Sequence, residues 1–335
     1  MSDGRARSGP ARFDSTLGAW ILSNHADVSA ALRDVRLSAV ATAAGDAPGH
    51  AAVRRTAARD FSPERLAAWC AETAAKHVAR IPVGRPVDLV REFAAPWSLA
   101  LAAKAACPTG GDMEAARLSA LAREVFLAAA TATDSTVSPR ALAASAELAQ
   151  SLQRATAEAS IDVQAFVALT QTLPAFLAYA WLELFQNPEE AHRLRHNGDL
   201  MPQAIEELLR LAGPSRAIFR IAESDVSIGA AKILSGERVV LMLAAANRDP
   251  AVFANPDRFD LSRGERHLAF GHGTHSCVGA SMIRMAAAAA TRALLAATSD
   301  VELVGDVDWI DGFAIRAPAS LHAHIQNSQR PVPIT

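Results

Sequence analysis

The sequence predicts a mainly α-helical fold with small β-sheets at its margins, formed by a single domain over residues 1–335. Three observations support this prediction. Half of the residues are hydrophobic, which is enough for a large core. Helical patterns follow one another from residue 50 until Gly213 and Pro214, a pair that commonly ends a helix. Short β-like runs broken by glycine and aspartate come next, and no repeat or linker divides the chain.

The elements are expected in the following order. Residues 13–28 have short apolar runs with turn residues and predict a small pair of strands, and residues 28–38 predict a helix. Further helices are predicted over residues 50–61, 62–81, 113–130, 139–157, 161–186, 187–197 and 201–213. Ser62 is suited to cap the second of these helices, with Pro63 in its first turn.

The character of the sequence changes after Pro214. Residues 216–250 contain short strand-like runs, and residues 256–270 are irregular. An alanine-rich helix is predicted over residues 278–297, and the last segment again shows short strand-like pieces.

Charge and cysteine content restrict the location and the partners. The chain carries 33 basic and 35 acidic residues, a balance that indicates neither a nucleic-acid nor a membrane partner. Cys70, Cys107 and Cys277 are few, odd in number and far apart, which favours a reducing cytoplasm over a disulfide framework. The N-terminus lacks the apolar core of a signal peptide. Polar residues and a proline interrupt the apolar run over residues 165–185, which therefore predicts a buried helix.

The stretch HLAFGHGTHSCVGA, residues 267–280, places Cys277 between a glycine-rich loop and a predicted helix. A thiolate that ligates iron needs glycines, so that the backbone can approach a flat macrocycle, and a positive helix end that holds its charge. Cys277 meets these needs. The ordinary alternative is a small buried cysteine. A zinc site with His272 or His275 is a weaker one, because no second ligand pair lies nearby.

This loop resembles the haem-binding loop of cytochromes P450, and all six defined positions match: Phe270, Gly271, Gly273, His275, Cys277 and Gly279. The resemblance implies a P450 fold that holds haem b, with Cys277 as the thiolate ligand of the iron. Such a ligand favours O–O cleavage. It also implies that Phe270, Gly271 and Gly279 line the haem and that His275 lies near a propionate.

Other parts of the chain match the same family in the same order. Glu207 and Arg210 match its E-x-x-R motif and share one face of a helix. In the family this pair is locked to a further arginine, for which Arg258 is the candidate, and the trio serves folding rather than chemistry.

Two basic sites resemble the family's anchors for the haem propionates. His50 and Arg54, four residues apart, match the start of its haem-contacting helix, and Arg220 matches an arginine on a β-strand. Together with His275 they form the expected propionate set, because guanidinium groups pair well with carboxylates.

The helix predicted over residues 161–186 should cross the distal face of the haem, opposite the cysteine. Family members usually carry A/G-G-x-(D/E)-T there, and this chain has ALTQT over residues 168–172. Thr172 keeps the alcohol, which in the family helps to deliver protons to dioxygen. Gln171 replaces the acid, and an amide cannot ionise.

Two other residues of this helix also depart from the pattern. Leu169 adds bulk where the family has a glycine, and Pro174 lacks an N–H and is expected to kink the helix. Leu169, Gln171 and Thr172 are thus the candidate catalytic residues. Two interpretations stay open: Thr172 and water suffice for ordinary chemistry, or the protein does not perform ordinary oxygen activation.

Three elements of the family are expected to be missing. GPARF lies almost at the N-terminus, so the first helix is absent; residues 39–47 alone replace much of the B–C loop; and almost nothing remains of the G–H loop and H helix near residues 157–161. Because two of these losses affect the substrate lid, we expect an open distal pocket. It could admit a large or carrier-tethered substrate, or a partner chain or second copy could complete it.

Three functions are consistent with these observations. The first is a P450-type monooxygenase that tailors a bacterial secondary metabolite, with electrons from a ferredoxin-type donor. That donor would dock on a basic face formed by Arg54, Arg55, Arg59, Arg263 and Arg266. The second is another haem-thiolate enzyme, for peroxide-driven oxidation, isomerisation, dehydration or cyclisation. The third is a degenerate member that acts as a binding or recruitment module.

Overall fold

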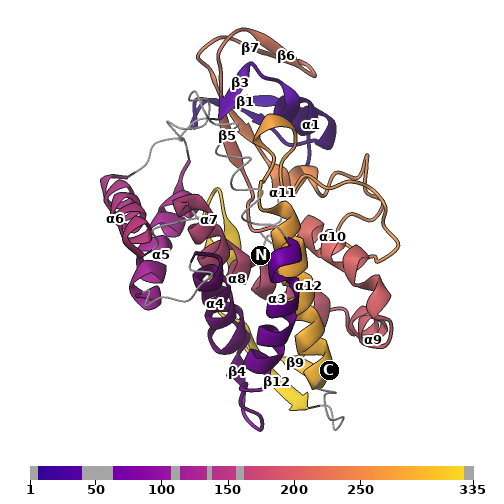
Figure 1. Cartoon of the computed structure of the whole chain (residues 1–335). Coiled ribbons are helices and arrows are strands. Elements are labelled where there is room, and N and C mark those ends of the chain that lie inside the picture. The colour runs from indigo at the N-terminus through magenta and orange to yellow at the C-terminus, as the bar shows by residue number, and fades with distance from the viewer. Residues whose placement is uncertain (1–6, 40–62, 107–113, 134–137, 156–161, 328–335) are drawn as a thin grey trace.

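The computed structural model describes residues 7–39, 63–106, 114–133, 138–155 and 162–327. Its helices are α1(His25–Arg33), α3(Pro63–Val78), α4(Ala95–Ala106), α5(Ala115–Thr131), α6(Pro139–Ala155), α7(Val163–Val167), α8(Leu173–Phe185), α9(Pro188–His196), α10(Met201–Ala212), α11(Leu243–Ala246) and α12(Ala280–Ala297). Two π-helical turns, η1(Val90–Ala94) and η2(Ala168–Thr172), precede α4 and α8, and two 3₁₀ turns are η3(Gly198–Leu200) and η4(Gly273–His275). The predicted mainly helical fold is confirmed (Figure 1).

The strands form small sheets at opposite ends of the helical body (Figure 1). The strands are β1(Arg12–Asp14), β2(Ala19–Leu22), β3(Leu37–Ala39), β4(Val87–Asp88), β5(Ile218–Ala222), β6(Val226–Ile228), β7(Ala231–Ile233), β8(Arg238–Leu241), β9(Thr298–Leu303), β10(Trp309–Asp311), β11(Arg316–Pro318) and β12(His322–Asn327). One sheet has the order β1-β2-β8-β5-β3, and β2 runs parallel to β8. The others are β4-β12-β9 and the hairpins β6-β7 and β10-β11.

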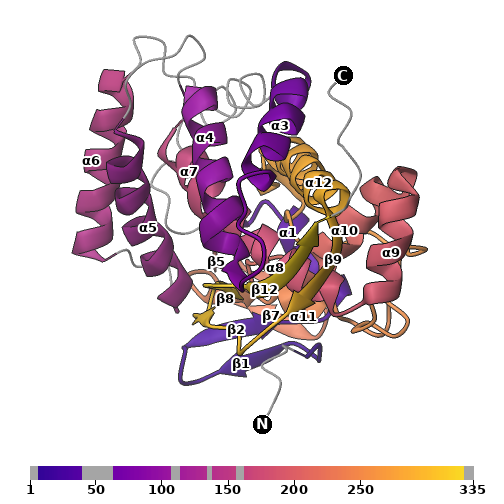
Figure 2. The same cartoon turned by 90° about the horizontal axis from the view of Figure 1, so that it is seen from below.

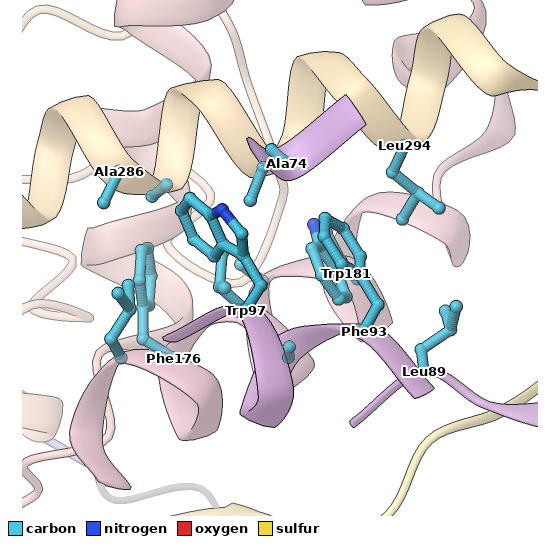
Figure 3. Close-up of a cluster of buried hydrophobic side chains, with 14 of the residues drawn as sticks. Ala74, Leu89, Phe93, Trp97, Phe176, Trp181, Ala286 and Leu294 are labelled. Carbon is cyan, nitrogen blue, oxygen red and sulfur yellow. The ribbon is translucent and has the colours of Figure 1, made fainter. Parts of the chain in front are cut away.

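The core is built around α8, in which every residue from Leu173 to Leu184 is buried. Figure 3 shows the aromatic centre of this core, where the rings of Phe93 and Trp181 stack with centroids 5.3 Å apart. The indole N–H of Trp181 donates to the Thr291 hydroxyl at 3.1 Å, and the indole N–H of Trp97 is satisfied in the same way by a threonine on α3. The apolar run in this part of the chain is therefore a core helix, as predicted, and 72% of its most apolar window is buried.

Both π-helical turns end two residues before a proline. Leu173 N–H bonds to Ala168 O, five residues back, and Pro174 follows. In η1 the same pattern precedes Pro96. A proline lacks an N–H and its ring clashes with the carbonyl four residues earlier, and a widened turn relieves this conflict. The disturbance predicted at Pro174 thus takes the form of a π turn within the distal motif.

The structure differs from the predicted elements in three places. The helix predicted over residues 28–38 ends at Arg33, and residues 37–39 form strand β3. The first helix begins at His25, three residues earlier than expected, because Asn24 caps it by accepting from Asp27 N–H at 2.7 Å. The segment from Val90 to Ala106, for which no helix was predicted, is η1 followed by α4. Most of the buried residues of α4 are alanine or serine, so its apolar face gives little contrast in the sequence.

Several predictions concern residues outside the described part of the chain. These are the helix over residues 50–61, the Ser62 cap and the shortened segments near residues 39–47 and 157–161. The three missing elements therefore stay a prediction.

Candidate functional site

The loop that carries Cys277 is closed by its own backbone. Cys277 N–H donates to Phe270 O at 2.9 Å, and Gly271 N–H donates to Leu268 O at 2.9 Å. Gly271 and Gly273 have φ values of 66° and 74°, which favour glycine. At Gly273 space also demands glycine, because a Cβ would lie 2.6 Å from the carbonyl oxygen of Leu32 on α1. The loop is therefore preformed and seated against α1.

The outer surface of this loop is not covered by the rest of the described chain. No residue from Ala269 to Ser281 is buried, although Leu268 and Met282 on either side are. Cys277 is exposed at the N-terminal end of α12, and a Cβ added at Gly279 would lie 4.0 Å from its Sγ. A helix N-terminus stabilises a thiolate, and the glycine leaves space beside the sulfur.

Cys70, the other described cysteine, differs from Cys277 in its burial. Cys70 is fully buried in the core, and this burial raises the pKa of its thiol to about 12. A thiol with that pKa stays protonated at neutral pH. Of the two cysteines in the described part, only Cys277 fits an iron ligand, and its uncovered, glycine-lined surface fits a flat macrocycle. Cys107 lies outside the described residues.

The structure describes only some of the residues that were predicted to contact the haem. Phe270 packs against the main core, with the Arg284 guanidinium 4.7 Å from its ring centre. His275 lies in the cysteine loop, and Arg220 is buried on β5, where its Nη1 donates to Phe219 O. His50 and Arg54 lie outside the described residues, so the proposed propionate set stays a prediction.

The three candidate catalytic residues lie together on η2, and α7, η2 and α8 form one continuous helical segment that we call the distal helix. Leu169 is buried. Nε2 of Gln171 lies 3.2 Å from both the carbonyl oxygen and the hydroxyl of Ser119 on α5. An amide nitrogen carries two hydrogens, so both donors of Gln171 are used and only its oxygen is left, as an acceptor.

The two threonines of η2 differ in their hydrogen bonding. Thr170 donates from its hydroxyl to Phe166 O at 2.8 Å within the helix. The Thr172 hydroxyl is partly exposed and makes no hydrogen bond to the part of the chain that the structure describes. Of the hydroxyl and amide groups in the motif, Thr172 therefore has the one donor that no described residue binds.

Glu207 and Arg210 form a buried ion pair, as the E-x-x-R motif predicted, with Nε–Oε2 and Nη2–Oε1 distances of 2.7 and 2.8 Å. The prediction that Arg258 is the third member of this network was wrong. Arg263 donates from Nε to Glu207 Oε1 at 3.0 Å with its side chain 5% exposed, whereas Arg258 is exposed. Arg258 contributes its carbonyl oxygen, which accepts from Nη2 of Arg210 and of Arg263.

This correction also affects the predicted basic face. Because Arg263 is locked against Glu207, it cannot present its charge to a partner. Arg266 is exposed as expected, and Arg54, Arg55 and Arg59 lie outside the described residues.

A depression of about 1000 Å³ lies beside the cysteine loop. It is lined by residues of α1, α10, α12 and the loop itself, including Cys277, and by no described residue of the distal helix. It is therefore not the open distal pocket expected from the sequence, which stays a prediction.

Glu206 on α10 and Glu265 are the acidic residues that line this depression. Arg284 Nη2 donates to its Oε2 at 2.9 Å, and His267 Nε2 lies 3.2 Å from the same oxygen. Partial burial raises the pKa of Glu206, but the contacts with His267 and Arg284 outweigh this effect and hold the pKa at about 2. This trio joins α10 and α12 to the cysteine loop.

Sequence reasoning missed Ser119 and the trio of Glu206, His267 and Arg284. No local pattern could have identified Ser119, because it meets Gln171 only through the packing of α5 on the distal helix. Arg284 lies one turn beyond the N-terminus of α12 and faces α10 only because the two helices pack together. Spacing along one helix carries no information about such partners.

A sequence profile described as Cytochrome P450 matches residues 164–297. Nocardicin C N-oxygenase of Nocardia uniformis subsp. tsuyamanensis is 31% identical over 353 aligned positions, which cover 90% of this chain and 88% of that protein. The biotin biosynthesis cytochrome P450 of Bacillus subtilis is 40% identical over 152 residues, but these are only 38% of its length and 45% of this chain.

Among solved structures, P450BioI in complex with an acyl carrier protein that bears hexadec-9Z-enoic acid matches with a TM-score of 0.82. The sequences are 26% identical, and the match covers 95% of this chain and 94% of that one. A mutant of P450 EryK with erythromycin B gives the same TM-score at 22% identity and supports the fold alone.

The cysteine loop, the buried ion pair and these matches together define a haem-thiolate protein. The chain belongs to the cytochrome P450 family, whose members include oxygenases such as nocardicin C N-oxygenase.

Proposed function

We propose that this chain is a haem b-dependent monooxygenase that tailors a bacterial secondary metabolite in the cytoplasm. The observation that carries the proposal is the exposed Cys277 thiol in a preformed loop at the N-terminus of an 18-residue helix, where no described residue covers the loop surface. The similarity to nocardicin C N-oxygenase along most of both chains supports the oxygenase class and a role in specialised metabolism.

The residues on the two faces of the proposed haem site have different roles. Haem bound through a thiolate supplies the chemistry that cleaves an O–O bond. The Cys277 thiolate is held by the α12 N-terminus and by a loop that its own hydrogen bonds have already ordered. On the other face, the uncommitted Thr172 hydroxyl is the group that can hold a proton or a water molecule. Gln171 has no donor left for this role, because both its N–H groups bind Ser119, and its amide cannot ionise.

The proposed substrate is a large small molecule or one tethered to a carrier protein, and the proposed electron donor is a ferredoxin-type protein. The structural match to P450BioI, which was solved with an acyl carrier protein, supports the carrier-tethered class. Completion of the distal pocket by a second copy or a partner chain remains an alternative within this proposal.

A second function is favoured by one specific observation. Because Gln171 is neither ionisable nor available as a donor, a haem-thiolate reaction without reductive dioxygen activation would need no change in this site. Peroxide-driven oxidation, isomerisation, dehydration and cyclisation belong to this class. A recruitment module without catalysis is less well supported, because the complete cysteine loop would serve no purpose in it.

The cofactor assignment is tested by the reduced carbon-monoxide difference spectrum of the purified protein. Wild type and the control Cys70→Ala should show the strongly red-shifted band of thiolate-ligated haem, and Cys277→Ser should lose it. A colourless wild type, or a band that survives Cys277→Ser, would contradict the assignment.

The two enzyme classes are separated by turnover assays on candidate substrates. The monooxygenase requires dioxygen, a ferredoxin and its reductase, and should show no product when any of them is omitted. Full turnover with hydrogen peroxide alone, or with no oxidant, would establish the second class.

A further inference from the structure

Helix α5 lies between α6 and the distal helix, and both views show α6 outermost (Figures 1 and 2). Near the N-terminal end of α5, Ser119 accepts both N–H groups of Gln171. Near its C-terminal end, Ala130 O accepts from Ala314 N–H at 3.0 Å, in the turn between β10 and β11. Two hydrogen-bonded contacts therefore hold α5, one at each end.

At the second contact there is no space for a side chain on residue 312. A Cβ on Gly312 would lie 2.0 Å from Ala130 O and 2.5 Å from its carbonyl carbon, both far inside van der Waals contact. The φ of Gly312 is not in the left-handed region, so space alone requires the glycine here. Gly312 N–H bonds to Ile315 O, which closes the turn that rests on α5.

A small apolar cluster joins the same elements between these two contacts. Phe126 of α5 packs with Ala175 of the distal helix and Ala317 of β11, and all three are buried. This cluster is separate from the main core and is completed by Leu127, Val167, Ile310 and Ile315. The position of α5 thus depends on the distal helix and on the β10-β11 hairpin together.

We propose that Gln171 and Gly312 are positioning residues that clamp α5 at both ends, so that α5 and α6 shift relative to the distal helix and the β10-β11 hairpin only when both contacts break. The chemistry of residue 171 supports this assignment. A carboxylate has no N–H and would repel the Ser119 carbonyl, whereas an amide satisfies both Ser119 oxygens. The glutamine is therefore required by the clamp, and the clamp does not depend on which reaction the site performs.

The clamp is tested by hydrogen–deuterium exchange of the haem-loaded protein, measured by mass spectrometry. Gln171→Leu removes both hydrogen bonds and should speed exchange in the N-terminal half of α5 by about five- to tenfold. Gly312→Ala should speed exchange in β10, β11 and the C-terminal half of α5. Exchange in α9 and α12, which touch neither contact, should not change.

Matched controls use the same substitutions where no contact exists. Gln150 lies on the exposed face of α6, and an added Cβ at Gly264 meets no atom within 4 Å. Gln150→Leu and Gly264→Ala should leave the exchange of α5 at the wild-type rate.

A double-mutant cycle separates the clamp from a general loss of stability. Ser119→Ala alone should speed exchange in α5 by about twofold, because the carbonyl acceptor remains, and should add almost nothing to Gln171→Leu. The second readout is the rate at which 4-phenylimidazole associates with the haem-loaded protein. This rate should rise in both Gln171→Leu and Gly312→Ala. Unchanged exchange in α5, or an equal increase in α9 and α12, would overturn the proposal.

Discussion

At the scale of single residues, the most consequential group is a buried carboxylate. Glu207 accepts from Arg210, from Arg263 and from Asp260 N–H, and its side chain is 3% exposed. Two buried guanidinium groups thus share one carboxylate, and removing that carboxylate would leave both without their counter-charge.

Glu207→Gln is expected to lower the free energy of unfolding by about 3–5 kcal/mol, because it leaves buried positive charge uncompensated. Urea unfolding measures this change. Glu190→Gln is the matched control, because its partner Arg193 is 55% exposed, and it should cost less than about 1 kcal/mol. Equal effects of the two substitutions would contradict the assignment of Glu207 as the organising charge.

Glu206, the neighbouring residue, makes stability depend on pH in a defined direction. Its folded-state pKa of about 2 lies below the unfolded value of 4.5, so folding favours the carboxylate form. The contribution is present above pH 4.5 and is lost as the pH falls toward 2. Its size is at most about 1 kcal/mol, because the side chain is 44% exposed and solvent screens the pair.

The measurement compares unfolding free energies of wild type and Glu206→Gln between pH 6 and pH 3. The difference between the two proteins should be largest at pH 6 and should shrink below pH 4.5. A difference that grows on acidification would show that the carboxylate is not stabilised in the fold.

At the scale of elements, the distal helix shows what the sequence could and could not predict. Its existence, its burial and a disturbance at Pro174 followed from apolar length and from proline chemistry. The partner of Gln171 did not, because it belongs to α5, 52 residues away. Likewise the loop around Cys277 was predictable residue by residue from spaced glycines, whereas the third arginine of the buried network was assigned to Arg258 instead of Arg263.

The start of the distal helix depends on a local cap. The Asp162 side chain accepts from Ala165 N–H at 2.7 Å. Asp162→Ala should lower the free energy of unfolding by about 1 kcal/mol, and Asp162→Asn should retain most of it, because asparagine caps about equally well. Thermal or urea unfolding of the three proteins gives the comparison, and an equal loss in both variants would mean that charge rather than capping is responsible.

At the scale of the whole molecule, the aromatic centre links elements from distant parts of the chain. Trp181 of α8 stacks on Phe93 of η1 and donates to Thr291 of α12. Leu89, directly before η1, and Leu294 of α12 border the same centre (Figure 3). A substitution at Trp181 should therefore change the stability of the whole cooperative unit.

Trp181→Ala is expected to cost about 3–5 kcal/mol, and Trp181→Phe about 1–3 kcal/mol, because the phenyl ring keeps the stacking but leaves the Thr291 hydroxyl without its donor. Far-ultraviolet circular dichroism during urea unfolding should show one transition in both variants. Leu142→Ala, at a position 56% exposed on α6, should change stability by less than about 0.5 kcal/mol. More than one transition would show that this centre does not unite the elements that it joins.

The network around Arg210 also limits how the protein can evolve. Arg210 donates to the carbonyls of Asn247, Pro256 and Arg258, while Glu207 holds Asp260 and Arg263. Two residues on one helical turn thus bind the irregular stretch at several positions between residues 247 and 263. Irregular segments ordinarily tolerate insertions and deletions. Here an added or lost residue would pull at least one of these anchors out of place, so related chains should vary in this stretch by substitution and keep its length constant.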